Sequence, residues 1–186
     1  MNLMRALILS DSHIPERAVW IPRPIEEYIL SEGFDLVVHA GDVIEERLIR
    51  FIKERVTKDV FAVKGNMDYL KLPRYVKIQL ESVELGVTHG DRVYPRGNIA
   101  VLTRFAHTIG VRVLVSGHTH MPFIVYDKSG VLHVNPGSIT GVWGGGGGTG
   151  IPSFAELTVN SRTVTVTVFE LVGHSILKKE TYSHIF

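Results

Sequence analysis

The sequence predicts an α/β fold in which two mixed β-sheets pack face to face with helices on the outside. Three observations predict it. In the first third of the chain, short apolar runs alternate with helical patterns, as they do in βαβ units. From residue 75 onward, β-favouring segments follow one another with a single helical pattern among them. Near the end, the strict alternation of "TVTVTVF" (163–169) predicts a strand with one buried face.

The first part of the chain contains the strand and helix signals that predict parallel βαβ units. Short apolar runs that stop at polar turns predict three buried parallel strands, at 5–10, 35–40 and 60–65. A helix is expected from about Pro24, a residue favoured in a first helical turn, to Gly33. A second helix is expected over 45–55, with Leu48 and Ile52 on its short apolar face.

The rest of the chain is predicted to be mostly β. Strands are expected at 75–80, 83–90, 111–115, 122–127, 131–134, 153–159 and 163–171. The one further helix is expected over 98–109, with Gly110 as its cap and an apolar side that belongs to the core. Five consecutive glycines (144–148) lie in a loop near 139–152, and the sequence leaves open whether this loop is a lid or an inert insertion.

Composition excludes several classes of protein. The 186 residues are 45% hydrophobic and 21% charged, which fits one globular domain over residues 1–186. A net charge of +1 argues against a strong nucleic-acid-binding surface, and the lack of cysteine excludes disulfides and thiolate ligands. No signal peptide and no apolar run of about 18 residues is recognised, so we expect a cytoplasmic protein with no membrane partner. A homo-oligomer is left open.

Polar clusters follow five of the expected strands directly. Because loops at the carboxyl ends of strands converge in α/β sheets, we expect the donor side chains in these clusters to lie together. The candidate metal ligands are Asp11, His13, Asp42, Asn66, His89, His118 and His120. The catalytic residues are predicted among them, as Asp42, Asn66 and His118.

These donors predict a dinuclear metal site. Seven oxygen and nitrogen ligands are too many for one tetrahedral ion, but they suit two divalent ions, with manganese expected first and nickel, iron, cobalt or zinc as alternatives. We place Asp42 in the middle as a carboxylate that bridges both ions. Two dications against two aspartates favour an anionic substrate and lower the pKa of a bridging water, which supplies hydroxide for a phosphoryl displacement.

The ordered motifs "DSH…GD…GN…HG…GHTH" resemble the signature of the calcineurin-like metallophosphoesterase superfamily, over roughly residues 5–172. Within it the chain is similar to the small uncapped phosphodiesterases. The resemblance implies a four-layer αββα sandwich and a phosphodiester substrate. It also implies one ion held by Asp11, His13, Asp42 and His120. The second ion would be held by Asp42, Asn66, His89 and His118.

Two positions depart from this pattern. Met67 stands where many members carry a histidine thought to protonate the leaving group, and Asp91 stands where relatives often carry a second histidine. The stretches "THGDRVYPRGN", "NPGSITG" and "IPSF" also resemble the retromer scaffold subunit of vacuolar sorting, which keeps a protein-interaction scaffold with vestigial activity as the alternative function. A DNA nuclease is disfavoured, because the chain has no basic stripe.

Residues beside the ligands have their own predicted roles. We expect Asp68 to orient a ligand, with the capping of a turn as the alternative, and Asn135 to shape a turn next to the site rather than to touch metal. For Arg92 and Arg96, phosphate binding and ordinary surface exposure remain open alternatives.

The remaining histidines are not expected in the site. His39 is expected to be a hydrogen-bonded core residue. His107 and His133 are read as structural, and His174 and His184 are expected to face solvent in a polar C-terminal segment.

Overall fold

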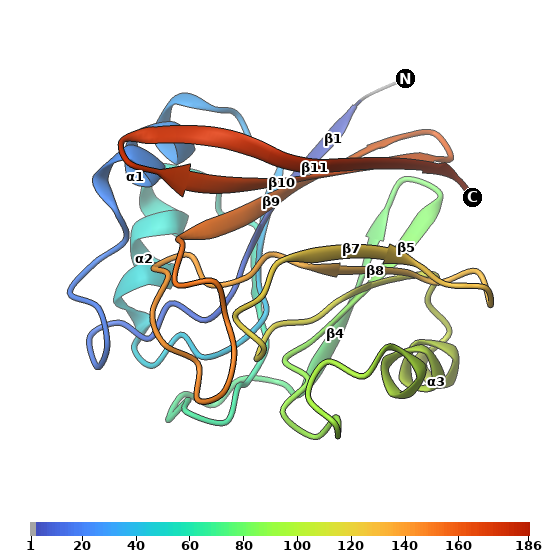
Figure 1. Ribbon diagram of the computed structural model, residues 1–186. Helices are drawn as coiled ribbons and strands as arrows, with labels where there is room; N and C mark the ends of the chain where they lie inside the picture. Colours follow the sequence, from blue (N-terminus) through green and yellow to red (C-terminus); the bar gives the residue numbers. More distant parts are fainter. Residues whose placement is uncertain (1–2) are drawn as a thin grey trace.

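Residues 3–186, which the computed structural model describes, form two β-sheets and three α-helices (Figure 1). The six-stranded sheet has the order β11-β10-β9-β1-β2-β3, with bounds Ser175–Ile185, Thr163–Val172, Ser153–Asn160, Met4–Leu9, Leu36–His39 and Val60–Ala62. The five-stranded sheet has the order β4-β5-β6-β8-β7, with bounds Tyr75–Leu80, Val83–Thr88, Val113–Val115, Leu132–Asn135 and Phe123–Tyr126. The helices are α1 (Arg23–Ser31), α2 (Glu46–Arg55) and α3 (Ile99–Ile109).

Each sheet combines a parallel part with antiparallel neighbours. β1, β2 and β3 pair in parallel, and β9, β10 and β11 continue that sheet as antiparallel strands. In the other sheet β5, β6 and β8 are parallel, and β4 and β7 are antiparallel edges. The loops that follow the parallel strands of both sheets carry the polar clusters.

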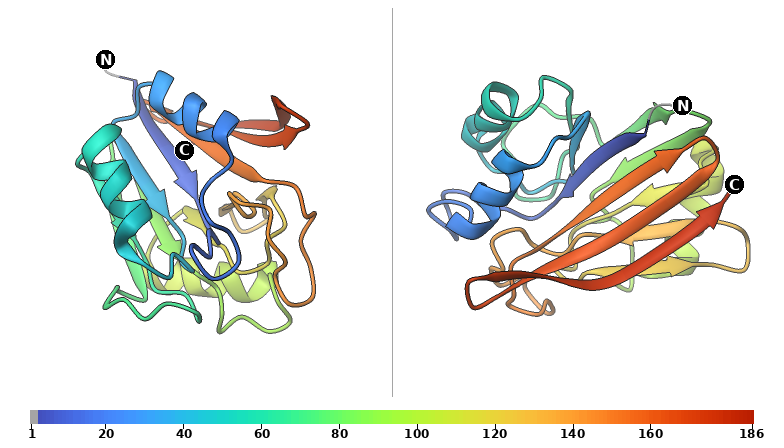
Figure 2. Two further views of the ribbon diagram at one scale, coloured as in Figure 1. Left: turned by 90° about the vertical axis from the view of Figure 1, so that its left-hand side faces the viewer. Right: turned by 90° about the horizontal axis from the view of Figure 1, so that it is seen from above.

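The elements stack in four layers. An apolar core between the sheets contains Ile8, Val38, Val87 and Val115. Two further apolar clusters lie outside the sheets. In one of these, α1 and α2 cover the outer face of the six-stranded sheet, and in the other α3 covers the five-stranded sheet. The left view in Figure 2 shows α1 and α2 in front of β1 and β2. The predicted αββα sandwich is therefore confirmed, as is the core role of the apolar side of α3.

The expected strands omit one at the C-terminus, and the expectation for His184 is wrong. Residues 175–185 form β11, which pairs with β10 along its whole length, with a register shift between Val168 and Phe169. The strand is mostly exposed and mostly polar. It therefore lacks the apolar pattern by which the other strands are predicted. His184 does not simply face solvent, because its half-buried ring lies 4.1 Å from the centroid of Tyr126. His174, at the β10–β11 turn, is exposed as expected.

Two of the other histidines outside the predicted site, His39 and His133, are buried as structural groups. His39 is fully buried, and its Nε2 lies 3.2 Å from the hydroxyl of Ser12. His133 is buried with its Nε2 2.9 Å from the hydroxyl of Thr103, while His107 is exposed on α3. None of the helices in residues 3–186 is long and apolar enough to cross a lipid bilayer.

Candidate metal centre

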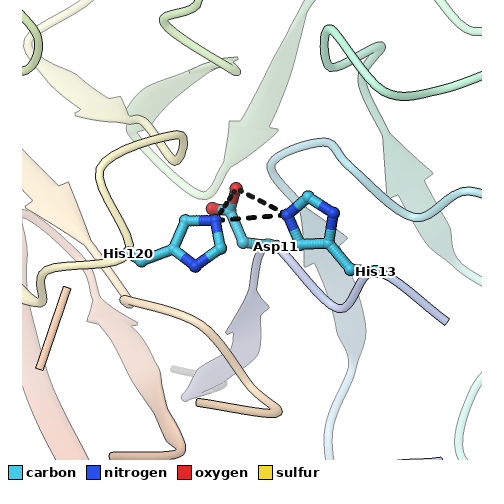
Figure 3. Close-up of side chains that lie close together, drawn as sticks. All are labelled: Asp11, His13 and His120. Carbon is cyan, nitrogen blue, oxygen red and sulfur yellow. Dashed lines mark hydrogen bonds and ion pairs between the residues drawn. The ribbon is translucent and has the colours of Figure 1, made fainter. Parts of the chain in front are cut away.

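Three candidate ligands meet at the end of β1. The Nε2 atoms of His13 and His120 lie 3.2 Å apart, and Asp11 Oδ1 lies 3.2 Å from His120 Nε2 and 3.8 Å from His13 Nε2. Figure 3 shows the three side chains pointing toward one another. All three are buried. Their ligand atoms are close enough together to hold one metal ion.

A second group adjoins the first and is arranged around Asp42. Asp42 Oδ2 lies 3.4 Å from His89 Nε2 and 3.5 Å from His13 Nε2, so it is nearly equidistant from one histidine of each group. Asn66 Oδ1 lies 3.3 Å from His89 Nε2. Asp11, Asp42 and His89 also satisfy the geometry for holding an ion. Asp11 therefore takes part in both groups, whereas the family resemblance gives it to one ion only.

Asp11 has one oxygen held by the protein and one left free. Its Oδ2 accepts hydrogen bonds from the hydroxyl of Ser10 at 2.6 Å and from the backbone N–H of His118 at 2.9 Å. Its Oδ1 is buried without a hydrogen-bond partner. A buried carboxylate oxygen without a partner is costly unless a cation compensates it. This donor set therefore fits a bound metal ion.

Backbone carbonyls set the tautomers of two histidines. His89 Nδ1 lies 2.7 Å from the carbonyl of Ala40, and His120 Nδ1 lies 2.7 Å from the carbonyl of Val142. Because a carbonyl only accepts, each Nδ1 must carry the proton. Each Nε2, in the neutral ring, then has a lone pair directed at the carboxylates, as metal-binding histidines require.

Asp42 is held in place by the segment that follows β3. Asp68 accepts the backbone N–H groups of Asp42, Ile44 and Gly65 at 2.6–2.9 Å, which is the orienting role predicted for it. The N–H of Met67 donates to Asp42 Oδ1 at 2.8 Å, and Oδ2 faces His13 and His89. A Cβ at position 65 would lie 2.1 Å from Asp42 Oδ1, so only glycine allows this approach.

Five candidate ligands have strained backbones. Asp11, His13, Asp42, His118 and His120 have φ values between 48° and 67°, a region that residues other than glycine rarely adopt. Each such residue costs about 1–3 kcal/mol and persists where the surrounding structure holds it, typically at functional sites. The sequence gives no signal of this strain.

His118 is the one candidate histidine that belongs to neither ligand group. Its ring centroid lies 5.0 Å from that of His89, but its Nδ1 lies 3.3 Å from the guanidinium of Arg96. Arg96 also donates to the carbonyls of His118 and Gly144. Arg96 thus links the loop after β6 to the glycine-rich loop by hydrogen bonds. Neither alternative considered for Arg96, phosphate binding or ordinary surface exposure, includes this role. Arg92 is exposed and lines a pocket together with Arg96 and His118.

Asn135 shapes the neighbouring turn, as predicted. Its amide donates to the carbonyl of Gly117 at 2.9 Å, and its Oδ1 accepts the N–H of Gly137.

The histidines of the site differ in pKa because their surroundings differ. Burial opposes protonation of His89, but its hydrogen bond to Asp42 and the charges of Asp11 and Asp42 outweigh it and raise the pKa of His89 to about 9. Burial lowers the pKa of His13 and of His118 to about 4. Burial also works against ionisation of Asp11, yet the imidazoles of His120 and His89 and the hydroxyl of Ser10 hold its pKa below its usual range.

Sequence reasoning did not predict that Arg17 and Trp143 lie at the site. Arg17 and Trp143 line the pocket together with the candidate ligands. Arg17 donates to the carbonyl of Trp143 at 2.8 Å. An arginine after β1 and a tryptophan before a glycine run carry no recognisable motif, so only the fold reveals their contact.

Comparisons with known proteins agree with this geometry. Residues 4–162 match the family model of the calcineurin-like phosphoesterase superfamily domain. A "probable metallophosphoesterase" of Methanocaldococcus jannaschii is 42% identical over 72% of this chain and 67% of its own length.

Two solved structures share the fold over nearly the whole chain. Vacuolar protein sorting 29 of Cryptosporidium parvum has a TM-score of 0.92 at 24% identity and covers 99% of both chains. The Zn²⁺ complex of Vps29 from Entamoeba histolytica has a TM-score of 0.88 at 26% identity, covering 97% of this chain and 99% of that one.

Proposed function

The chain belongs to the calcineurin-like phosphoesterase superfamily, and from that premise we propose that it is a phosphodiesterase that works with two divalent metal ions. The observation that carries the proposal is the position of Asp42 Oδ2, midway between His13 and His89 in two adjoining ligand groups. A carboxylate in that place suits two neighbouring ions better than one.

The proposed ligands divide along the two groups. Asp11, His13, Asp42 and His120 would hold one ion, and Asp42, Asn66, His89 and His118 the other, with manganese as the first expectation. When bound, two such ions polarise the phosphoryl oxygens of the substrate and supply a nucleophile at neutral pH. His118 would be one of these ligands, and in this structure its Nδ1 lies 3.3 Å from the guanidinium of Arg96.

The residues around the ligands set orientation and charge. Asp68 and the N–H of Met67 fix Asp42, and the carbonyls of Ala40 and Val142 fix the rings of His89 and His120. Arg17, Arg92 and Arg96 line the same open pocket and favour an anionic substrate.

The function is tested by hydrolysis of matched phosphate esters. Bis(p-nitrophenyl) phosphate should be hydrolysed at least about tenfold faster than p-nitrophenyl phosphate, and only with a divalent ion present. Chelation should abolish the activity and Mn²⁺ should restore it, because without divalent ions no water in the site is acidic enough to supply hydroxide at neutral pH. A monoester that is hydrolysed faster than the diester would point to a phosphatase instead.

Metal binding should also release a proton from His89. With its pKa near 9, His89 is protonated at pH 7.5, and a cation binds only the neutral ring. His13 and His118, with pKa values near 4, are already neutral at that pH and release none. Titration calorimetry in buffers of different ionisation enthalpy should show about one proton more for the wild type than for His89→Asn. That difference should disappear above about pH 10, and equal proton release by the two proteins at pH 7.5 would contradict the assignment.

A second candidate function is a protein-interaction scaffold. It is favoured by the match to Vps29 structures over nearly the whole chain and by the methionine at position 67. A Vps29 structure with Zn²⁺ exists, so metal content alone does not separate the two functions. Turnover of the diester in the presence of metal does separate them, because a scaffold with vestigial activity would bind the ion without efficient hydrolysis.

A further inference from the structure

The pocket over the candidate ligands has a rim that metal binding does not explain. Its volume is about 500 Å³. Besides candidate ligands its lining includes three arginines and two aromatic residues, namely Arg17, Arg92, Arg96, Tyr94 and Trp143, together with Met67 and Asp91. The two aromatic residues come from different loops, the one after β5 and the glycine-rich one before β9.

Trp143 is fixed close to a candidate metal ligand. The residue before it accepts a hydrogen bond from His120 Nδ1 through its carbonyl at 2.7 Å. The residue after it, Gly144, packs so tightly on the same ring that an added Cβ would lie 2.5 Å from His120 Cγ. Trp143 lies between these two residues. Because consecutive Cα atoms are about 3.8 Å apart, its backbone is held beside His120 from both sides of the chain.

The ring of Trp143 is not part of the core. It is 70% exposed, so burial does not account for a tryptophan at this position. The guanidinium of Arg17 lies 5.5 Å from its ring centroid, and the same guanidinium donates to its carbonyl. Arg96 donates to the carbonyl of Gly144. Two arginines thus hold the loop, one at the residue that carries the exposed ring and one at the next residue.

We propose, building on the proposed function, that Trp143 is a stacking surface for a nucleobase and that the substrates are phosphodiesters of nucleotides. The phosphate would lie at the ligand cluster, with the base on the Trp143 ring at the rim. Tyr94, 87% exposed in the same pocket, offers a second ring. Stacking on aromatic side chains accepts any base, because every base has a π-face. The net charge of +1 favours a small nucleotide over a long polyanionic strand.

Binding can be measured without turnover. The chain has two tryptophans, so Trp20→Phe leaves Trp143 as the only one. In this variant, loaded with Zn²⁺, AMP should quench the tryptophan fluorescence in a saturable way, and ribose 5-phosphate, which has the same phosphate but no base, should not. In calorimetry, Trp143→Ala should weaken AMP binding by about 5- to 150-fold. The affinities of this variant for AMP and for ribose 5-phosphate should therefore differ less than those of the wild type.

Two further variants distinguish stacking from a structural role. Trp143→Phe keeps an aromatic ring and should retain most of the AMP affinity. Tyr69→Ala removes a ring that is 81% exposed but does not line the pocket, and it should leave AMP binding unchanged. Equal binding of AMP and ribose 5-phosphate by the wild type, or equal AMP affinity of Trp143→Ala and the wild type, would overturn the proposal.

Turnover measurements distinguish a failure of the stacking proposal from a failure of the proposed phosphodiesterase function. Thymidine 5′-(p-nitrophenyl phosphate) and methyl p-nitrophenyl phosphate have the same leaving group, so the ratio of their kcat/KM values reports the nucleoside alone. The wild type should favour the nucleoside diester at least about fivefold, and Trp143→Ala should bring the ratio toward one. A ratio of one in the wild type, with both diesters hydrolysed, refutes the stacking surface and leaves the phosphodiesterase standing. Base-dependent AMP binding without hydrolysis of any diester supports the stacking surface and refutes the phosphodiesterase.

Discussion

Asp42→Asn should lower kcat/KM for bis(p-nitrophenyl) phosphate by at least about 10³-fold and reduce the metal content of both halves of the site. The reason is the position of Oδ2, which faces His13 in one group and His89 in the other. An amide has the same shape but carries no charge, so it neutralises neither ion and bridges them poorly. Metal content is measured on the purified protein by elemental analysis, and activity with Mn²⁺ in excess.

Variants that remove a ligand from one half provide the comparison. His13→Asn and Asn66→Ala each affect one proposed ion and should reduce activity less than Asp42→Asn does. The folded state of all three can be checked by circular dichroism. If Asp42→Asn kept two ions per chain and near-normal turnover, Asp42 would not be the bridge. Asp11, which belongs to both ligand groups, would then be the next candidate.

The fold could be predicted largely from the sequence because its strands are short apolar runs that end at polar turns. The same reasoning failed for β11, whose mostly exposed residues give no apolar signal. That strand is specified by its pairing with β10, a contact between segments rather than a local pattern. Element boundaries shifted by a few residues elsewhere, as for β3, which ends at Ala62 rather than at residue 65.

The candidate ligands could be proposed because side-chain chemistry and strand-end position are both visible in a sequence. What holds those ligands is mostly backbone, and backbone geometry is not visible. The carbonyls of Ala40 and Val142 and the N–H of Met67 could belong to any residue type. The positive φ values of Asp11 and His13 likewise fall on residues that seldom adopt them.

The wild type should hydrolyse activated aryl diesters far faster than alkyl diesters, by about 10²- to 10⁴-fold more than an enzyme with a general acid would. The half-buried Met67 lines the pocket beside Asn66, and a thioether has no proton to donate to a leaving oxygen. Nitrophenolate leaves without protonation, whereas an alkoxide does not. A plot of log kcat/KM against the pKa of the leaving group should therefore be steep for the wild type.

Met67→His should flatten that plot by raising the rates of alkyl diesters about 10²-fold, while nitrophenyl diesters change little. The substitution keeps the backbone N–H that holds Asp42, so the carboxylate stays in place. Met67→Leu, which keeps an apolar side chain and adds no proton donor, should retain the steep plot. Asp68 is an unsuitable substitute acid, because its two oxygens already accept three backbone N–H groups and it does not line the pocket. A flat plot for the wild type would show that another group, such as the exposed Tyr94 of the same pocket, already donates the proton.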